Sequence, residues 1–166
     1  TDETSKPLSF YAATKKTNEV LSHSYSKIYG LPITCLRLFT VYGPYGRPDM
    51  APYKFTKAAI EKKPIKVYNN GKHKRDFTYV SDVAKAIYKL VPIRPKKNTF
   101  QTINVCSSKT VTLMNFINLV ERLTKNKITK IYLKKQKGDV IKTFGENKIL
   151  KRLTKIKQFV SIDNGM

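Results

Sequence analysis

The sequence predicts an α/β fold in which short buried strands of a parallel sheet alternate with helices. Residues 33–39 and 102–106 are short, mostly apolar runs, which is typical of strands covered on both faces. Between and around them, segments repeat apolar residues at the 3.6-residue spacing of a helix. A loop with two glycines and two prolines, residues 40–49, directly follows the first strand, and ligands of α/β proteins bind at such carboxyl ends.

The first helix is expected from residue 10 to about residue 29. Ser9 is placed to cap its N-terminus through the side-chain hydroxyl. Gly30 suits the left-handed residue that ends a helix, and Pro32 prevents continuation. One face at helical spacing carries Ala13, Val20, Leu21, Ser24 and Ile28.

The remaining elements follow from periodicity and from the glycine, proline and capping residues between them. Thr112 is expected to cap one helix, Ser81 another, and Pro92 and Pro95 mark a linker. The predicted helices are 51–62, 82–90, the segment after Thr112 and a short one near 146–153; the predicted strands are 33–39, 64–68, 75–80, 102–106 and 128–133, with a turn at 69–72.

Composition bounds the class of protein. The chain has 166 residues, of which 40% are hydrophobic, and this is enough for one domain with a real core or for part of a larger one. It contains no membrane-length apolar run and no leader, and it starts at Thr1 without an initiator Met, so we expect a fragment of something longer. Cys35 and Cys106 are expected as buried thiols, with no disulfide framework or metal spacing, which favours a cytoplasmic location. His23 and His73 show no partner spacing and are expected at the surface.

The charge is strongly positive, with 33 Lys and Arg against 11 Asp and Glu, a net +22. Such a charge attracts nucleic acid, so a basic nucleic-acid-binding module is an alternative from a different functional class. The lysines are nevertheless spread along the chain, thickening only at 54–74 and 125–157, and no RNP, zinc-finger or KH pattern occurs. A diffuse lysine excess is more typical of a solvated surface.

Tyr11 and Lys15 are four residues apart at the start of the first helix, so their side chains share a face. An ammonium group beside a phenol favours the phenolate, and a phenol with a lowered pKa can accept a proton from a hydroxyl and return it. This chemistry is needed when a nicotinamide cofactor removes hydride from a sugar alcohol. The plain structural alternative is a surface lysine next to a half-buried tyrosine.

Four motifs in order give the chain a resemblance to a known family: residues 9–16 (SFYAATKK), 36–51 (LRLFTVYGPYGRPDMA), 75–83 (RDFTYVSDV) and 136–140 (QKGDV). From about residue 2 to 150 the chain resembles the extended short-chain dehydrogenase/reductases, the NAD-dependent epimerase/dehydratase family. Within it the motifs look most like the UDP-glucuronate epimerases of capsule and polysaccharide synthesis. The resemblance implies the C-terminal part of a Rossmann-like fold, an incomplete parallel sheet plus a small substrate-binding α/β subdomain. Residues 1–50 would end the cofactor-binding domain, and 51–166 would be mostly the substrate-binding subdomain, with 76–106 returning partly to the main sheet.

The resemblance also implies roles for residues near the cofactor NAD. Tyr11 would be the acid/base that deprotonates the sugar 4-hydroxyl as hydride passes to NAD. Lys15 would lower its pKa and hydrogen-bond the nicotinamide ribose. Leu38 and Phe39 match positions that pack near the nicotinamide.

A second group of residues matches positions that bind the UDP-sugar substrate. Thr40 and Arg47 would face the sugar carboxylate, for which a guanidinium fork and a hydroxyl are suited. Arg75 would hold the diphosphate and Asp139 the uridine ribose, and Val67 and Tyr68 would lie against the uracil. The structural alternatives are solvent-facing arginines, turn residues at Thr40 and Asp139, and core packing for Tyr68.

The part of the family that binds most of NAD is missing from the sequence. No Gly-x-x-Gly-x-x-Gly motif occurs, and the catalytic Ser/Thr should precede Thr1. Residues 143–146 also depart from the family's usual alanine-aspartate pair. We therefore expect the chain alone to bind no NAD and to catalyse nothing, with a separately encoded N-terminal half as a possible partner and homodimers in the full-length family. A nucleotide-sugar 4,6-dehydratase of the same superfamily remains the second enzyme hypothesis, and no metal site is expected.

Overall fold

The computed structural model describes residues 4–93, 95, 99–136 and 138–166. Its helices are α1 (Phe10–Tyr29), α2 (Ala51–Ile60), α3 (Val80–Leu90), α4 (Leu113–Thr124), α5 (Lys148–Thr154) and α6 (Ile162–Gly165), with a 3₁₀ turn, η1 (Asn69–Gly71). Its strands are β1 (Ile33–Leu38), β2 (Thr40–Tyr42), β3 (Ile65–Tyr68), β4 (Lys74–Tyr79), β5 (Phe100–Val105), β6 (Thr110–Thr112) and β7 (Lys130–Leu133). The part of the predicted linker at 94 and 96–98 lies outside the described residues.

The strands pair mainly in parallel, as predicted. β1 pairs with β5 along its whole length, and β3 pairs with β7. β4 is the centre of a three-stranded sheet, parallel to β2 and antiparallel to β6. β2 and β6 were not predicted, because three residues are too few to show a period.

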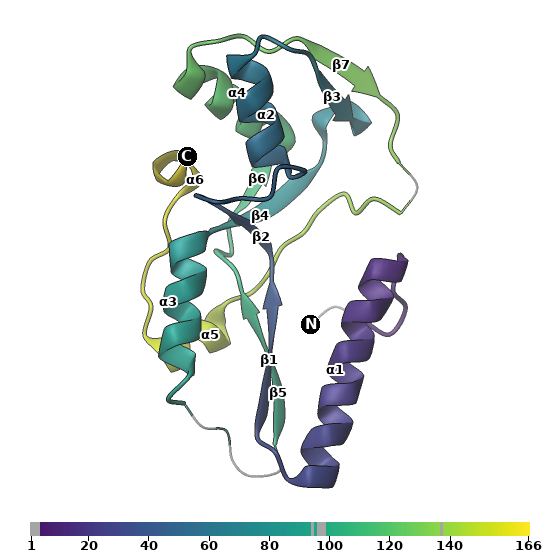
Figure 1. The fold of residues 1–166 in the computed structure, drawn as a ribbon, viewed down its shortest axis with the longest axis vertical. Helices are drawn as coiled ribbons and strands as arrows, with labels where there is room; N and C mark the ends of the chain where they lie inside the picture. Colours follow the sequence, from purple (N-terminus) through teal and green to yellow (C-terminus); the bar gives the residue numbers. More distant parts are fainter. Residues whose placement is uncertain (1–3, 94, 96–98, 137) are drawn as a thin grey trace.

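Two groups of elements surround these sheets (Figure 1). In the lower part of the view, α1 lies on one side of the β1–β5 pair, and α3 and α5 lie on the other. In the upper part, α2 and α4 lie beside β3 and β7. The larger core cluster belongs to the upper group and includes Phe55, Val67, Phe77, Phe116 and Val120. The smaller belongs to the lower group and includes Val83, Ala86, Ile103, Val105 and Leu150.

The ends of α1 agree with the prediction, but the predicted face does not. The Ser9 hydroxyl accepts a hydrogen bond from the Ala12 N–H, and Gly30 adopts φ 67°. Val20, Leu21 and Ile28 are 54%, 53% and 72% exposed. The helix instead turns Glu19 toward Arg37 of β1 and Ser26 toward the carbonyl of Leu31. The Glu19–Arg37 pair therefore joins α1 to β1, and Ser26 joins α1 to the segment before β1, whereas the apolar stripe is exposed.

Two local predictions were wrong, one was confirmed, and the prediction of two buried thiols was confirmed only for Cys106. Ser81 lies inside α3, whose N-cap is Tyr79 without a side-chain cap bond, whereas the Thr112 hydroxyl accepts from the Asn115 N–H as predicted. His73 is buried at 5% exposure, not at the surface, because the end of the η1 turn carries it between Asp139 and the start of α4. Cys106 is fully buried and Cys35 half-buried, both as free thiols.

No helix among the described residues is long and apolar enough to cross a membrane.

Candidate functional site

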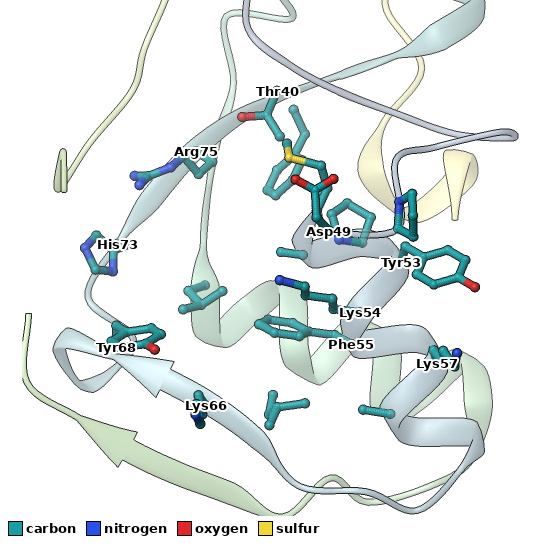
Figure 2. Close-up of a pocket in the computed structure, with 18 of the residues that line it drawn as sticks. Thr40, Asp49, Tyr53, Lys54, Phe55, Lys57, Lys66, Tyr68, His73 and Arg75 are labelled. Carbon is teal, nitrogen blue, oxygen red and sulfur yellow. The ribbon is translucent and has the colours of Figure 1, made fainter. Parts of the chain in front are cut away.

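A cavity of about 850 Å³ opens between α2, β3, β4 and the segment around Asp139 (Figure 2). This volume lies within the usual range for sites that bind a small molecule or cofactor. Four of the six residues that the sequence assigned to the substrate line it: Thr40, Tyr68, Arg75 and Asp139. In Figure 2 Arg75, His73 and Tyr68 lie along one side of the cavity, and Thr40 lies above Arg75. We call this cavity the α2–β4 pocket.

Asp139 holds the two basic residues on that side together. The Arg75 Nη2 donates to Asp139 Oδ1 at 3.0 Å, and Arg75 Nη1 donates to the carbonyls of Lys74 and Ile141 at 3.0 and 3.3 Å. His73 Nε2 lies 3.0 Å from Asp139 Oδ2, without the alignment of a hydrogen bond. Arg75 and Asp139 are 64 positions apart in sequence, and only the fold brings them into contact.

Asp76, the residue of β4 after Arg75, joins β4 to two other segments of the chain. Its carboxylate is fully buried and accepts hydrogen bonds from the Ser107 N–H and hydroxyl and from the N–H groups of Ser108 and Gly145. Burial raises the pKa of Asp76, and these four hydrogen bonds oppose the rise without cancelling it. The same carboxylate thus ties β4 to the loop after β5 and to the segment that follows Asp139.

Val67 and Arg47 lie elsewhere. The Val67 side chain is completely buried in the core among the α2 and α4 side chains and does not line the pocket. Arg47 forms a bidentate pair with Asp49, with N–O distances of 3.0 and 2.5 Å, and this pair raises the Arg47 pKa. Arg47 lines a second cavity of about 790 Å³ beside the 41–47 loop, α2 and the chain end, so it and Thr40 face different cavities.

Tyr11 and Lys15 share a face of α1, as their spacing predicts. The Lys15 Nζ lies over the Tyr11 ring, 5.4 Å from its centroid. Tyr11 is 72% exposed, and neither side chain lines the two described cavities. Arg47 is near enough for Tyr11 to contribute to its raised pKa, after the larger contribution of Asp49. The Tyr11–Lys15 contact is thus present, but Tyr11 is exposed on the surface of α1.

Leu38 and Phe39 lie at the carboxyl end of β1, next to Thr40 of β2. Leu38 is 51% exposed. Phe39 is half-buried against the backbone of Gly145: a Cβ at residue 145 would lie 2.5 Å from the Phe39 ring and 2.6 Å from the Cys106 Sγ. A side chain at this position would therefore force the Phe39 ring or the Cys106 thiol to shift.

Sequence reasoning missed other charged residues of the pocket. Asp49 and Lys54 line it at the start of α2, and Lys66 lines it from β3. The position of α2, directly after the glycine- and proline-rich loop, was the available signal for Asp49 and Lys54; nothing in the sequence pointed to His73. Among the described residues no cluster of three His, Cys, Asp or Glu side chains could hold a metal ion.

Comparison with known proteins identifies the family of this chain. Residues 1–106 match the NAD dependent epimerase/dehydratase family. A probable UDP-glucuronate 4-epimerase of Rhizobium meliloti is 39% identical over 181 residues, covering 99% of this chain and 53% of the relative. The UDP-glucuronate 4-epimerase of Thermodesulfobacterium geofontis is 41% identical over 162 residues, covering 96% and 49%.

Solved structures of similar fold point to the same family. UDP-glucuronic acid 4-epimerase from Bacillus cereus in complex with UDP-glucuronic acid and NAD matches with a TM-score of 0.87 and 34% identity, over 96% of this chain and 51% of that one. MoeE5 in complex with UDP-glucuronic acid and NAD matches with a TM-score of 0.89 and 28% identity, over 96% and 54%. The chain spans about half the length of the curated relatives it matches. The predicted fold class and resemblance are thereby confirmed, and the chain belongs to the NAD dependent epimerase/dehydratase family.

Proposed function

We propose that this chain is the substrate-binding part of an NAD-dependent UDP-glucuronate 4-epimerase, which inverts C4 of the sugar through a 4-keto intermediate. The observation that carries the proposal is the α2–β4 pocket, in which Thr40, Tyr68, Arg75 and Asp139 line a single cavity. The relatives and the solved neighbours named above are of this kind. We also propose the division predicted from the motifs, with residues 1–50 on the cofactor side and most of 51–166 on the substrate side.

The pocket offers complementary groups to each part of a UDP-sugar. The Arg75 guanidinium can form charge-assisted hydrogen bonds with a diphosphate, and Asp139 can accept from ribose hydroxyls. Tyr68 presents an aromatic side chain for a flat base. Thr40 marks the sugar end, and the Arg47–Asp49 pair would have to open for Arg47 to reach a carboxylate there, because Arg47 faces the second cavity.

The acid/base chemistry is assigned to the exposed start of α1. NAD, when bound, supplies the acceptor that takes hydride from C4 and returns it to the opposite face. Tyr11 takes the C4 hydroxyl proton as the ketone forms and gives it back, with the Lys15 ammonium held over its ring. The residues present fit this cofactor in part: the exposed Leu38 and the half-buried Phe39 give an apolar surface at the end of β1. That the chain alone binds no NAD and turns over nothing remains a prediction.

The test is a chimera that joins the N-terminal half of the Rhizobium meliloti relative to this chain. We expect the chimera to convert UDP-glucuronate to its C4 epimer. Chromatography of the nucleotide sugars measures the conversion. Tyr11→Phe should lower kcat by about 100-fold or more, since positioned acid/base catalysis is typically worth at least that much, while UDP binding stays unchanged.

Three results, one from this assay and two from separate measurements, would count against the proposal. A folded chimera that binds UDP-glucuronate and NAD but forms no epimer would rule it out. Release of a 4-keto-6-deoxy sugar from dTDP-glucose would favour the dehydratase. Steeply salt-dependent binding of the chain to any DNA duplex would favour the basic nucleic-acid-binding module.

A further inference from the structure

The α2–β4 pocket carries an excess of positive charge that its own carboxylates do not neutralise. Five Lys and Arg side chains line it, against three carboxylates. Most of the cations are paired within the pocket wall: Lys57 and Lys63 with Glu61, at 3.8 and 2.9 Å, and Arg75 with Asp139, at 3.0 Å. Over the residues that the structure describes, no carboxylate lies within 4.0 Å of Lys54 or Lys66.

Of these two lysines, Lys54 is the one that faces Arg75. Its side chain extends from α2 toward the side of the pocket where Arg75, His73 and Tyr68 lie (Figure 2). Lys66 lies on β3 beyond Tyr68, at the end of the pocket away from Thr40. The two cations therefore differ in position along the cavity as well as in the element that carries them.

Asp49, a carboxylate on which the charge of Lys54 acts, already has a partner. Arg47 holds the Asp49 carboxylate through two hydrogen bonds and is the main cause of its lowered pKa, to which the charge of Lys54 adds. Lys54 is thus close enough to act on Asp49 electrostatically but makes no ion pair with it. An unpaired, exposed ammonium directed into a cavity is free to bind an anion.

We infer that Lys54 is a second cation for the diphosphate of the substrate and binds it from the wall opposite Arg75. The inference rests on the proposed function. Arg75 shares its charge with Asp139, so it alone cannot balance a diphosphate, whereas a lysine adds a point charge with three donors on a flexible stem. Two cations on opposite walls also fix where along the pocket the diphosphate lies, between the base end at Tyr68 and the sugar end at Thr40.

The test compares UDP with uridine, since only UDP carries the diphosphate. Calorimetric titration of the 166-residue chain should show that Lys54→Met weakens UDP binding by about five- to tenfold, the effect of one charge-assisted contact at a partly exposed site. Uridine binding should change by less than about twofold, and the salt dependence of UDP binding should become shallower. Lys54→Arg should restore most of the affinity.

The matched control is Lys85→Met on α3, an exposed lysine that lines neither cavity. It should leave both affinities within about twofold, because screened charges at a distance contribute little. Far-UV circular dichroism and a thermal melt confirm that each variant is folded, which an exposed substitution should not disturb.

The outcomes separate this inference from the proposed function. If the folded wild-type chain binds no UDP, both fail together. If it binds UDP and Lys54→Met binds it equally well, or if Lys54→Met weakens UDP and uridine alike, the role of Lys54 is wrong and the proposed function stands.

Discussion

The α2–β4 pocket and the exposed start of α1 differ in how completely the described chain builds them. In the pocket, Arg75 is held by Asp139 and two carbonyls, and the neighbouring Asp76 is buried with four hydrogen bonds. At the start of α1, Tyr11 is 72% exposed and its described contact is the Lys15 ammonium over its ring. The residue proposed to bind the nucleotide is thus fixed by contacts with distant segments, whereas the pair proposed for proton transfer is fixed by the spacing of one helical turn.

The proposed nucleotide binding and the proposed catalysis should therefore depend on the fold in different ways. A pocket braced by contacts many residues apart should fail when its buried anchors are removed. A helix end whose side chains are mostly exposed should tolerate substitution without loss of stability. The following substitutions test this contrast, from the largest expected effect to the smallest.

Asp76→Asn should destabilise the chain most, by about 3 kcal/mol, because an amide nitrogen would replace a carboxylate oxygen that accepts two N–H bonds in a buried site. Chemical denaturation at pH 7 measures the change. Asp163→Asn is the control, since the exposed Arg122–Asp163 pair should contribute less than about 0.5 kcal/mol. Equal effects of the two variants would contradict the anchoring role of Asp76.

Glu121→Gln should cost about 2 kcal/mol at pH 7, since it removes a buried carboxylate that binds Lys130 Nζ at 2.7 Å and the Ile128 N–H at 2.8 Å. These contacts hold the start of β7, which pairs with β3 of the pocket wall. The substitution therefore tests whether the pocket depends on a brace outside its lining. Urea denaturation measures the loss of stability. UDP binding to the variant should weaken only at urea concentrations near its unfolding midpoint.

The same residue predicts a pH dependence. The Lys130 contact, with the Ile128 N–H, lowers the Glu121 pKa from 4.5 to about 2. A carboxyl whose pKa is lowered by folding contributes its stability in full above its unfolded pKa and loses it as the pH falls toward 2. Asp76, whose pKa is raised by burial, has the opposite sign and loses stability as the pH rises past 3.8. The acid-side loss of stability should therefore be smaller in Glu121→Gln than in the wild-type chain, and an unchanged acid limb would rule out this assignment.

Gly145→Ala should destabilise the chain by about 1–2 kcal/mol through overpacking, because the added Cβ would lie 2.5 Å from the Phe39 ring. Phe39 lies in sequence between β1 and Thr40, which lines the pocket. Cys106→Ala in the same background should recover part of the loss, since the Cys106 Sγ is the other close atom, at 2.6 Å. Thermal melting of both variants measures the change in stability. An unchanged melting temperature in Gly145→Ala would show that the neighbouring side chains can move to make room for the added Cβ.

Tyr11→Phe and Lys15→Met should change the free energy of unfolding by less than about 0.5 kcal/mol, as exposed substitutions do. Neither should alter UDP binding, whereas Arg75→Met should weaken it about tenfold or more through loss of a charge-assisted contact. If Tyr11→Phe destabilises the chain as much as Asp76→Asn, the contrast between the two regions is wrong.

The sequence by itself determined the ends of two helices and the family. Ser9, Gly30 and Thr112 act on backbone groups a few residues away, so the ends of α1 and the start of α4 were predictable. The four motifs carried the family, and they singled out Arg75 and Asp139, which the structure places in one cavity.

Only the tertiary structure decided which side chains are buried and which cavity each one faces. His73 is buried, Val67 belongs to the core, Arg47 faces the second cavity, and the apolar stripe of α1 points outward. Each of these depends on a surface that a distant segment supplies, as Asp139 does for His73. A sequence pattern reports the period of its own element and not what packs against it, which is why these residues could be named in advance but not placed.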